Sequence, residues 1–535
     1  MRSRCPHLGL SISALISLAG CGGSGNPTTV LPSCVTTATV VCTKSGQVQG
    51  NLEGNLRAFR GIPFAAPPVG NLRWRPPASP ASWQGVRSAV TFGNRCPQTD
   101  FNGGVMGDED CLALNVYTTN PPPTSPQPVM VFFHGGGWTL GSSQDVPYDP
   151  APPLAGHGVV LVTAEYRLGL LGFYASQALT TEGSGTSGNY GLMDHIAALQ
   201  WVHDNIAEFG GDSGRVTIFG QSAGSGEVQA LLASPPAQGL FVRAAMESTV
   251  VPAGILGTGV ADAYPRYAPF PGLVGCASND LACLREVPAN TVILTELMSQ
   301  FPYFLYNLDP VILPVDPFVK LQQQGSPVPL LIGSNTEEAI GLGVDPSVVL
   351  TEAEYEAALH TQFDPYGSTV ANQVLALYPS SAYGSDPTYA HVAVETDFLL
   401  SKDTRNFARA VTGTGRPAVW RYLFSHWYEN DPAVLLPLRA FHTAELPFVF
   451  GNLDKIWYSL VPYTPTPAET TLSSQMMDYW AHFAATGDPN VAGATQWLSY
   501  DTVNENILQI NDTSVTINGY HNPQCDFFST LPENW

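Results

Sequence analysis

The residues most suited to chemistry lie in Gly220-Gln221-Ser222-Ala223-Gly224, a Gly-x-Ser-x-Gly pattern. The pattern follows an apolar run at 216–219 and precedes a stretch typical of a helix, so it predicts a sharp strand-to-helix turn. Such a turn lifts the serine hydroxyl clear of the backbone, and the flanking glycines avoid Cβ clashes. The helix would also aim unpaired backbone N–H groups at whatever Ser222 attacks. We therefore predict that Ser222 is a nucleophile.

A serine nucleophile needs a general base, and the base needs an acid that orients it. After a strand-turn-helix of this kind the partners follow in the order serine, acid, histidine, on loops after later strands. An apolar run at 328–332 leads into a turn with two adjacent acids, Glu337 and Glu338. His442 follows on a later loop, and His426 is an alternative base.

A third candidate for chemistry is the glycine triplet in His134-Gly135-Gly136-Gly137-Trp138, directly after a buried strand predicted at 129–133. Consecutive glycines are costly in backbone entropy, and their use is to bring bare N–H groups close to a ligand. The triplet predicts an oxyanion hole, and we interpret His134 as structural.

The surrounding pattern predicts elements that position these residues. Buried strands are expected at 129–133, 159–164 and 216–219, with an amphipathic helix at 192–206 between the last two. Strand, helix, strand indicates a parallel sheet with helices on its faces. We expect further strands at 328–332 and 419–423, antiparallel strands and loops over 37–130, and a helical lobe over 345–415.

The composition limits the classes of function. Of 535 residues, 44% are hydrophobic and 12% charged, so the chain can bury a large core. A formal net charge of −22 argues against a nucleic-acid partner. Apolar runs after residue 20 are only strand-length, and no Cys/His cluster has metal-ligand spacing. We therefore expect neither a metal nor a cofactor.

The first residues predict a targeting segment. A basic start, an apolar core at 8–19 and the sequence Leu18-Ala19-Gly20-Cys21 are typical of a bacterial lipoprotein signal. The prediction is a signal peptide at 1–20, a flexible linker at 21–36 and one domain at 37–535. Cys21 would carry the lipid anchor to a cell-envelope membrane, and the alternative is an ordinary secretory signal with a periplasmic or secreted product.

Export favours disulfides among the other cysteines. Spacing suggests Cys96 with Cys111 and Cys276 with Cys283, while a pair of Cys34 with Cys42 would leave Cys525 unpaired. The alternative is that all of them are reduced core thiols.

Together these motifs make the sequence resemble the type-B carboxylesterases, the family of liver carboxylesterases, para-nitrobenzyl esterases and cholinesterases. The resemblance covers nearly all of residues 40–535. The strand-to-helix turn at 220–224, hereafter the elbow, contributes to the resemblance, as do Glu338 and His442. The other matching motifs are Phe59-Arg60-Gly61-Ile62-Pro63-Phe64-Ala65, Pro67-Pro68-Val69-Gly70, Glu109-Asp110-Cys111-Leu112, Tyr166-Arg167-Leu168-Gly169, Gly188-Asn189-Tyr190-Gly191-Leu192, Phe209-Gly210-Gly211-Asp212 and Thr486-Gly487-Asp488-Pro489-Asn490.

The resemblance implies an α/β-hydrolase fold: a large, mostly parallel central sheet flanked by helices, with an N-terminal antiparallel portion and helical lobes. It implies a catalytic triad of Ser222, Glu338 and His442. It also implies an oxyanion hole from the N–H groups of Gly136, Gly137 and Ala223, an ion pair between Arg167 and Asp194, and the disulfides Cys96–Cys111 and Cys276–Cys283.

The implied activity is hydrolysis of small neutral carboxylic esters by a serine carboxylesterase. One alternative is an esterase for a bulky natural ester, such as a mycotoxin, feruloyl ester or polyester. Another is a non-catalytic adhesion module. Gln221 departs from the family, which usually has Glu before the nucleophile, and this removes a carboxylate that would favour cationic substrates.

Overall fold

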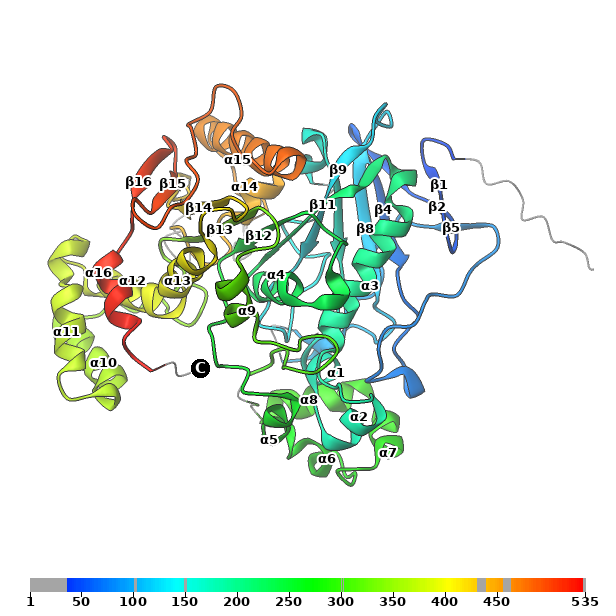
Figure 1. Ribbon diagram of the computed structural model, residues 1–535, viewed down its shortest axis with the longest axis horizontal. Helices are drawn as coiled ribbons and strands as arrows, with labels where there is room; N and C mark the ends of the chain where they lie inside the picture. The colour runs from blue at the N-terminus through cyan, green and yellow to red at the C-terminus, as the bar shows by residue number, and fades with distance from the viewer. Residues whose placement is uncertain are drawn as a thin grey trace, which may run out of the picture. The chain divides into compact units, whose positions relative to one another are not determined.

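The computed structural model describes residues 36–100, 103–148, 152–299, 301, 303–430, 439–455 and 463–532. Within these residues an 11-stranded sheet has the order β16-β15-β14-β13-β12-β11-β9-β10-β8-β4-β3 (Figure 1). Its strands are β3 (Asn51–Glu53), β4 (Leu56–Pro63), β8 (Ala113–Thr119), β9 (Gln127–Phe133), β10 (Val160–Ala164), β11 (Gly211–Gln221), β12 (Arg243–Glu247), β13 (Leu330–Asn335), β14 (Val419–Phe424), β15 (Asn506–Ile510) and β16 (Val515–Asn518).

The sheet is parallel in its centre and antiparallel at both edges. Neighbours from β10 through β15 pair in parallel, whereas β8, β4 and β3 on one side and β16 on the other pair antiparallel. This confirms the predicted α/β-hydrolase architecture, although β11 begins five residues earlier than the apolar run suggested, at Gly211.

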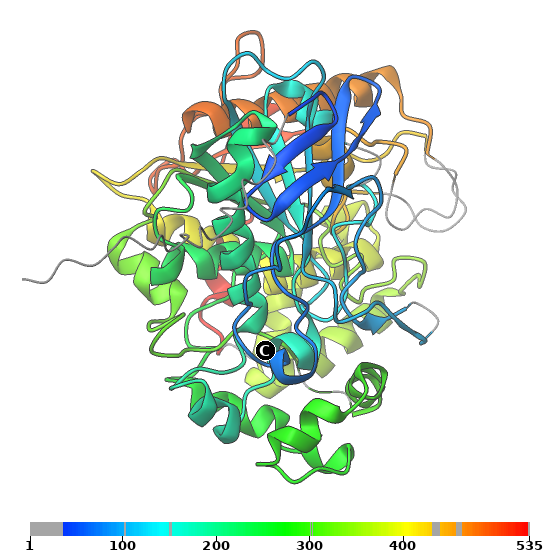
Figure 2. The ribbon, with the colours of Figure 1, turned by 90° about the vertical axis from the view of Figure 1, so that its right-hand side faces the viewer.

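The N-terminal part differs from expectation in one pairing. A small sheet joins β1 (Val40–Thr43), β2 (Gly46–Gln49) and β5 (Val86–Ser88), and in it β2 and β5 run parallel. The long connection between them allows this, since a parallel pair cannot be closed by a hairpin. Figure 2 shows these blue N-terminal strands in front, beside the antiparallel end of the large sheet.

Both faces of the central sheet are covered, which explains why strands such as β9 and β10 are largely apolar. Side chains alternate between the faces. On β9, Val129, Val131 and Phe133 belong to the core shared with α3 (Tyr190–Asn205) and α4 (Ala223–Ala233). Met130 and Phe132 belong to a second core, shared with α14 (Leu446–Phe450) and α15 (Pro467–Thr486).

The predicted helical lobe is present and has a core of its own. It consists of α10 (Glu352–Phe363), α11 (Val370–Leu377), α12 (Pro387–Thr396) and α16 (Asn522–Phe528), whereas α13 (Lys402–Val411) buries its apolar residues in the core shared with α3 and α4. Its centre contains buried aromatic residues such as Tyr355, Phe363 and Phe528. A π-helical segment, Asp397–Ser401, joins α12 to α13.

A second group of helices follows the parallel strands and carries one of the disulfides. The remaining helices are α1 (Gly169–Phe173), α2 (Gln177–Glu182), α5 (Tyr264–Tyr267), α6 (Phe270–Leu273), α7 (Leu281–Glu286), α8 (Ala289–Ser299) and α9 (Pro317–Gln324). Cys276 and Cys283 are bonded, as are Cys96 and Cys111, so both predicted disulfides are confirmed. Cys525 is buried and free. Cys34 lies outside the described residues, and its pairing with Cys42 stays a prediction.

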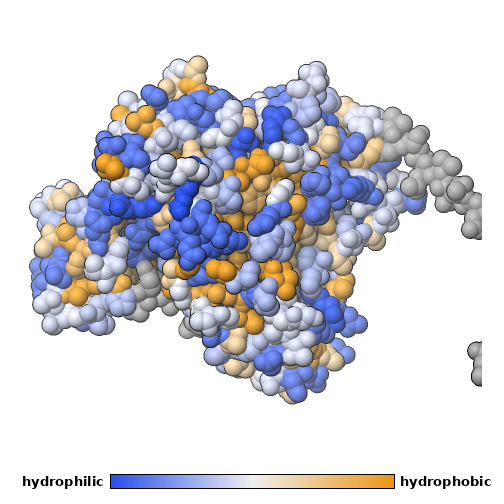
Figure 3. Space-filling view, in the orientation of Figure 1, coloured by the Kyte–Doolittle hydropathy of each residue, from blue (hydrophilic) through white to orange (hydrophobic). Residues whose placement is uncertain are grey.

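The predicted signal peptide, with Cys21, and the linker up to residue 35 also lie outside the described residues. Among the described helices, none is both long and apolar enough to cross a membrane. The face drawn in Figure 3 is a mosaic in which hydrophilic residues surround apolar patches near its middle.

The packing of Phe132 in the second core predicts that its removal destabilises the protein. The ring of Phe132 lies 4.7 Å from Tyr148, 4.9 Å from Phe219 and 5.0 Å from Phe450. We expect Phe132→Ala to lower the free energy of unfolding, measured by urea denaturation, by about 3–5 kcal/mol because it leaves a cavity. Val503→Ala, at an 88% exposed side chain, is the control and should change it by less than about 0.5 kcal/mol. Equal effects of the two substitutions would contradict this packing.

Candidate active site

Strand β11 turns sharply into α4 at Ser222, as the Gly-x-Ser-x-Gly pattern predicts. Ser222 has φ 56° and ψ −128°, a conformation that L-residues rarely adopt. The two glycines are required by close approach. A Cβ on Gly220 would lie 2.4 Å from the Gly224 carbonyl oxygen, and a Cβ on Gly224 would lie 2.0 Å from the Phe133 carbonyl oxygen. The turn is therefore packed tightly against the end of β9.

Glu338 and His442 meet although they lie on separate loops. Glu338 follows β13, and its Oε2 lies 2.7 Å from His442 Nδ1. Its other oxygen, Oε1, accepts a hydrogen bond of 2.6 Å from the backbone N–H of Asn335. The backbone N–H of His442 donates to the Ile340 carbonyl oxygen, 3.0 Å away. Both side chains are buried, so the carboxylate holds the imidazole in one orientation.

The alternative residues are engaged elsewhere. The carboxylate of Glu337 accepts a hydrogen bond of 2.5 Å from the Thr336 hydroxyl, and burial raises its pKa. His426 lies 3.2 Å from Glu469 and 2.8 Å from Asp512, so both of its ring nitrogens face carboxylates outside this site. The geometry thus favours Glu338 and His442 over these two.

Nε2 of His442 points to the elbow. Its partner is the side-chain amide nitrogen of Gln221, 3.3 Å away. Because Nδ1 faces a carboxylate, Nδ1 carries the proton and Nε2 is the acceptor, so the Gln221 amide donates to it. Ser222 Oγ makes no hydrogen bond with any described residue. Gln221, which departs from the family pattern and directly precedes Ser222, therefore contacts the free nitrogen of the imidazole.

The glycine triplet forms a turn over the elbow. Gly136 has φ 112° and Gly137 has φ 61°, both in the region that favours glycine. A Cβ on Gly136 would lie 2.0 Å from the Leu140 carbonyl oxygen. A Cβ on Gly135 would lie 2.9 Å from Ser222 Cβ. The predicted loop thus lies directly against the predicted nucleophile.

His134 is built into this turn. Its ring packs 4.4 Å from that of Tyr166, and its Nδ1 lies 2.8 Å from the Gly135 carbonyl oxygen. Burial lowers the pKa of His134 to about 3, so the imidazole is neutral near pH 7. These contacts support the structural role that the sequence suggested.

A cavity of about 420 Å³ opens beside Ser222. Trp138, Leu342 and the π-helical segment give it mostly apolar walls. Lys402 is the charged residue on its wall, and the Lys402 ammonium lies 2.9 Å from the Asp403 carboxylate. The lining residues are Gly137, Trp138, Ser222, Ala223, Thr249, Leu342, Phe398, Leu399, Leu400 and Lys402. Gly137, Ala223 and Ser222 therefore border one space, and Gly136 adjoins it.

Sequence reasoning missed two buried acids behind the triad candidates. Glu445 accepts a hydrogen bond of 2.5 Å from the Asn335 side chain, and burial together with the charge of Glu338 raises its pKa to about 7. Glu247 accepts a hydrogen bond of 2.6 Å from Trp480 Nε1, and burial raises its pKa well above the usual range. Glu445 follows His442 by three residues, and this proximity was the one sequence feature that could have indicated an acid near the site.

The ion pair implied by the resemblance is present. The guanidinium of Arg167 donates to both oxygens of Asp194, over 2.8 Å and 2.7 Å. Arg167 follows β10 and Asp194 lies on α3, so the pair ties the sheet to the helix that covers it. Across the described part of the chain, His, Cys, Asp and Glu side chains form no group that could hold a metal ion.

Known proteins share this architecture. The family model described as "Carboxylesterase family" matches residues 37–528. The para-nitrobenzyl esterase of Bacillus subtilis (strain 168) is 34% identical over 494 residues, which is 89% of this chain and 96% of that protein. Liver carboxylesterase 1F of Rattus norvegicus is 32% identical over 558 residues, covering 94% of each protein.

Two further proteins extend the comparison. The fumonisin B1 esterase of Sphingopyxis macrogoltabida is 34% identical over 476 residues, covering 86% of this chain and 84% of that protein. A solved structure of a PNB esterase superimposes with a TM-score of 0.76 at 32% identity, covering 92% of this chain and 100% of the other. The family match over residues 37–528, together with relatives that are 32–34% identical over most of their length, shows that this chain belongs to the carboxylesterase family.

Proposed function

We propose that this carboxylic ester hydrolase cleaves neutral esters through an acyl-enzyme on Ser222, with His442 as general base and Glu338 as the orienting acid. The contact of 2.7 Å between His442 Nδ1 and Glu338 Oε2, with Nε2 facing the elbow, carries the proposal. The N–H groups of Gly136, Gly137 and Ala223 form the oxyanion hole.

In the first half of the reaction Ser222 Oγ attacks the ester carbonyl carbon while His442 Nε2 takes the hydroxyl proton. This requires the Gln221 amide to leave Nε2, and catalytic contacts commonly tighten only when substrate is bound. The negative oxygen of the tetrahedral intermediate accepts hydrogen bonds from the oxyanion hole. The bond to the alcohol oxygen then breaks, and His442 gives its proton to the departing alcohol.

In the second half, water attacks the acyl carbon and His442 takes a proton from it. The bond to Ser222 Oγ breaks, the serine regains its proton and the carboxylic acid leaves. Glu338 stabilises the imidazolium in both halves without taking up its proton. No further reactant is consumed.

The cavity supports a preference for neutral esters. Its walls are mostly apolar, and the one ammonium among the lining residues is matched by the carboxylate of Asp403. With Gln221 in place of an acid, the elbow offers no negative charge to a cationic substrate. A small apolar ester can enter without leaving a charge unpaired in the cavity.

We further propose that residues 1–20 are a signal peptide, that 21–36 are a linker, and that a lipid on Cys21 anchors the domain from 37 to 535 in a bacterial cell envelope. The basic start, the apolar core and the sequence Leu18-Ala19-Gly20-Cys21 support this. Stable anchoring takes two or more acyl chains, as a modified N-terminal cysteine can provide.

The role of Ser222 is tested by covalent labelling. We expect the wild-type protein to hydrolyse para-nitrophenyl butyrate and to be labelled by an organophosphate. Ser222→Ala should lose the label and at least about 10⁴-fold in kcat, since the nucleophile is removed. Ser225→Ala, three residues along α4, is the control and should keep the label. A labelled, active Ser222→Ala enzyme would refute the assignment.

If Glu338 and not Glu337 orients His442, substitutions of these adjacent acids should lower kcat to different extents. We expect Glu338→Gln to lower kcat about 10³–10⁴-fold, because the amide cannot hold the productive imidazole tautomer. Glu337→Gln is the matched control, and we expect kcat within about threefold of wild type because its carboxylate contacts Thr336. Circular dichroism checks that both variants are folded. The reverse order of losses would make Glu337 the acid.

The anchor is tested by fractionation of cells that express the full chain. We expect wild-type activity in the membrane fraction and Cys21→Ser activity in the soluble fraction, because the variant has no sulfur to carry the lipid. Cys5→Ser, inside the signal peptide, is the control and should remain with the membrane. Release of both variants and the wild type would favour an ordinary secretory signal.

A further inference from the structure

The loop closed by the Cys96–Cys111 disulfide contains Gln98, whose side chain contacts Gly141, a residue that follows the glycine turn. Gln98 lies in β6 (Gln98–Thr99), which pairs with β7 (Val105–Met106), and it is 4% exposed. Its Nε2 donates to the Gly141 carbonyl oxygen over 2.9 Å, and its Oε1 accepts from the Gly141 N–H over 2.8 Å. Both backbone groups of Gly141 are therefore fixed by Gln98.

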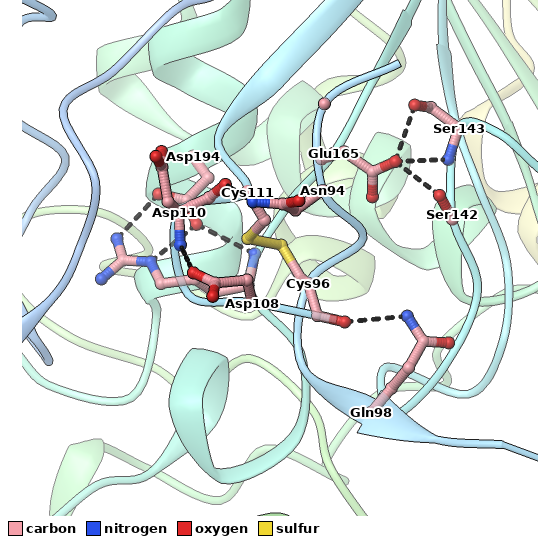
Figure 4. Close-up of a disulfide and its surroundings, with 12 residues drawn as sticks. Asn94, Cys96, Gln98, Asp108, Asp110, Cys111, Ser142, Ser143, Glu165 and Asp194 are labelled. Carbon is pink, nitrogen blue, oxygen red and sulfur yellow. Dashed lines mark hydrogen bonds and ion pairs between the residues drawn. A yellow bond between two sulfur atoms is a disulfide. The ribbon is translucent and has the colours of Figure 1, made fainter. Parts of the chain in front are cut away.

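Gln98 is itself held in place. Its Nε2 also donates to the Cys96 carbonyl oxygen over 3.0 Å, so the amide is anchored directly at the disulfide (Figure 4). Cys111, the other half of the bond, lies two residues before β8. The disulfide thus connects the segment that carries Gln98 to β8, a strand of the central sheet.

Gly141 packs against the start of the glycine turn. It has φ 103°, and a Cβ there would lie 2.4 Å from the Gly135 carbonyl oxygen and 2.6 Å from His134 Nδ1. The neighbouring Leu140 donates its N–H to the Gly136 carbonyl oxygen over 3.1 Å. We therefore expect a shift of Gly141 to displace the glycine turn, whose N–H groups are proposed to face the substrate.

A second support holds the following residues from the other side. Glu165, directly after β10, accepts hydrogen bonds from Ser142 Oγ over 2.6 Å, Ser143 Oγ over 2.8 Å and Ser143 N–H over 3.0 Å (Figure 4). Glu165 therefore fixes Ser142 and Ser143, whereas Gln98 fixes Gly141, the residue that packs against Gly135. This leaves Gln98 with the more direct influence on Gly136 and Gly137.

We propose that Gln98 is a positioning residue for the oxyanion hole, which it holds in register by fixing the backbone of Gly141. The inference rests on the proposed function of the glycine turn. Gln98 does not line the cavity beside Ser222, so it acts on the transition state through the loop and not on substrate binding. Loss of one complete oxyanion donor lowers kcat by about 10²–10³-fold, and a displaced donor should cost less.

The test uses Gln98→Met, which keeps the length and volume of the side chain but removes all three hydrogen bonds. With para-nitrophenyl butyrate we expect kcat to fall about 10–100-fold and KM to stay within about threefold. The inhibition constant of a trifluoromethyl ketone, whose adduct carries the same oxyanion, should rise by the factor by which kcat/KM falls. Organophosphate titration gives the concentration of active sites for each enzyme.

Asn490→Ala is the matched control. Asn490 fixes the backbone of Trp497 in the same way, accepting from its N–H over 2.7 Å and donating to its carbonyl oxygen over 2.9 Å. We expect this variant to lose stability but to keep the wild-type kcat and inhibition constant. If Gln98→Met behaves like Asn490→Ala, Gln98 is only structural and the inference is wrong.

A second variant tests the inference independently in case Gln98→Met folds poorly. Cys96→Ala/Cys111→Ala leaves Gln98 intact but removes its anchor, and we expect a smaller loss of kcat with a parallel rise in the inhibition constant. Unchanged values in the folded double variant would also overturn the inference. Failure of the proposed function has a different signature, namely persistent activity in Ser222→Ala.

Discussion

The active site depends on the side-by-side pairing of two parallel strands. β9 and β11 run in register, with Phe133 opposite Gly220, so both end at the same edge of the sheet. The glycine turn follows β9, and Ser222, the proposed nucleophile, follows β11. The contact between Gly224 and the Phe133 carbonyl oxygen is possible only without a side chain. The parallel hydrogen bonding between β9 and β11 thus brings the glycine turn and Ser222 together without long loops.

Glu338 and His442 lie at the same edge of the sheet. β13 is next but one to β11 in the sheet, and Glu338 follows it. The bridge between Glu337 and Phe441 then places His442 beside that turn. Glu338, Glu445 and Glu247 lie close together and are buried, so the repulsion between their negative charges is weakly screened by water. Burial is the main cause of the raised pKa of Glu445, and the nearby negative charge of Glu338 raises it further.

Local patterns were sufficient to predict the elbow, the glycine turn and the central strands. The signals there are short-range: an apolar run, a turn residue and a helix start. The sequence order of acid and histidine was also predictable, but the residues alone did not separate Glu337 from Glu338. That choice depends on which carboxylate faces the imidazole, which only the folded loops determine.

Long-range packing explains what the sequence did not reveal. The Gln221 contact with His442, the Gln98 contact with Gly141 and the cavity wall at 398–400 each join segments that no local pattern relates. The π-helical turn that forms this wall has no recognisable signature in its residues. The parallel pairing of β2 with β5 was missed for the same reason, because its partners are separated by a long connection.

The wide separation of the contributing segments has a consequence for synthesis of the protein. The sheet inserts β9 between β10 and β11, and its C-terminal strands lie at the far edge from its N-terminal ones. We expect a chain with so many distant strand pairings to fold slowly, and its strand edges to be open to aggregation until the last strands have docked. Because the proposed general base, His442, lies late in the chain, we expect ester cleavage to begin only after the loop that carries it has been synthesised and has docked.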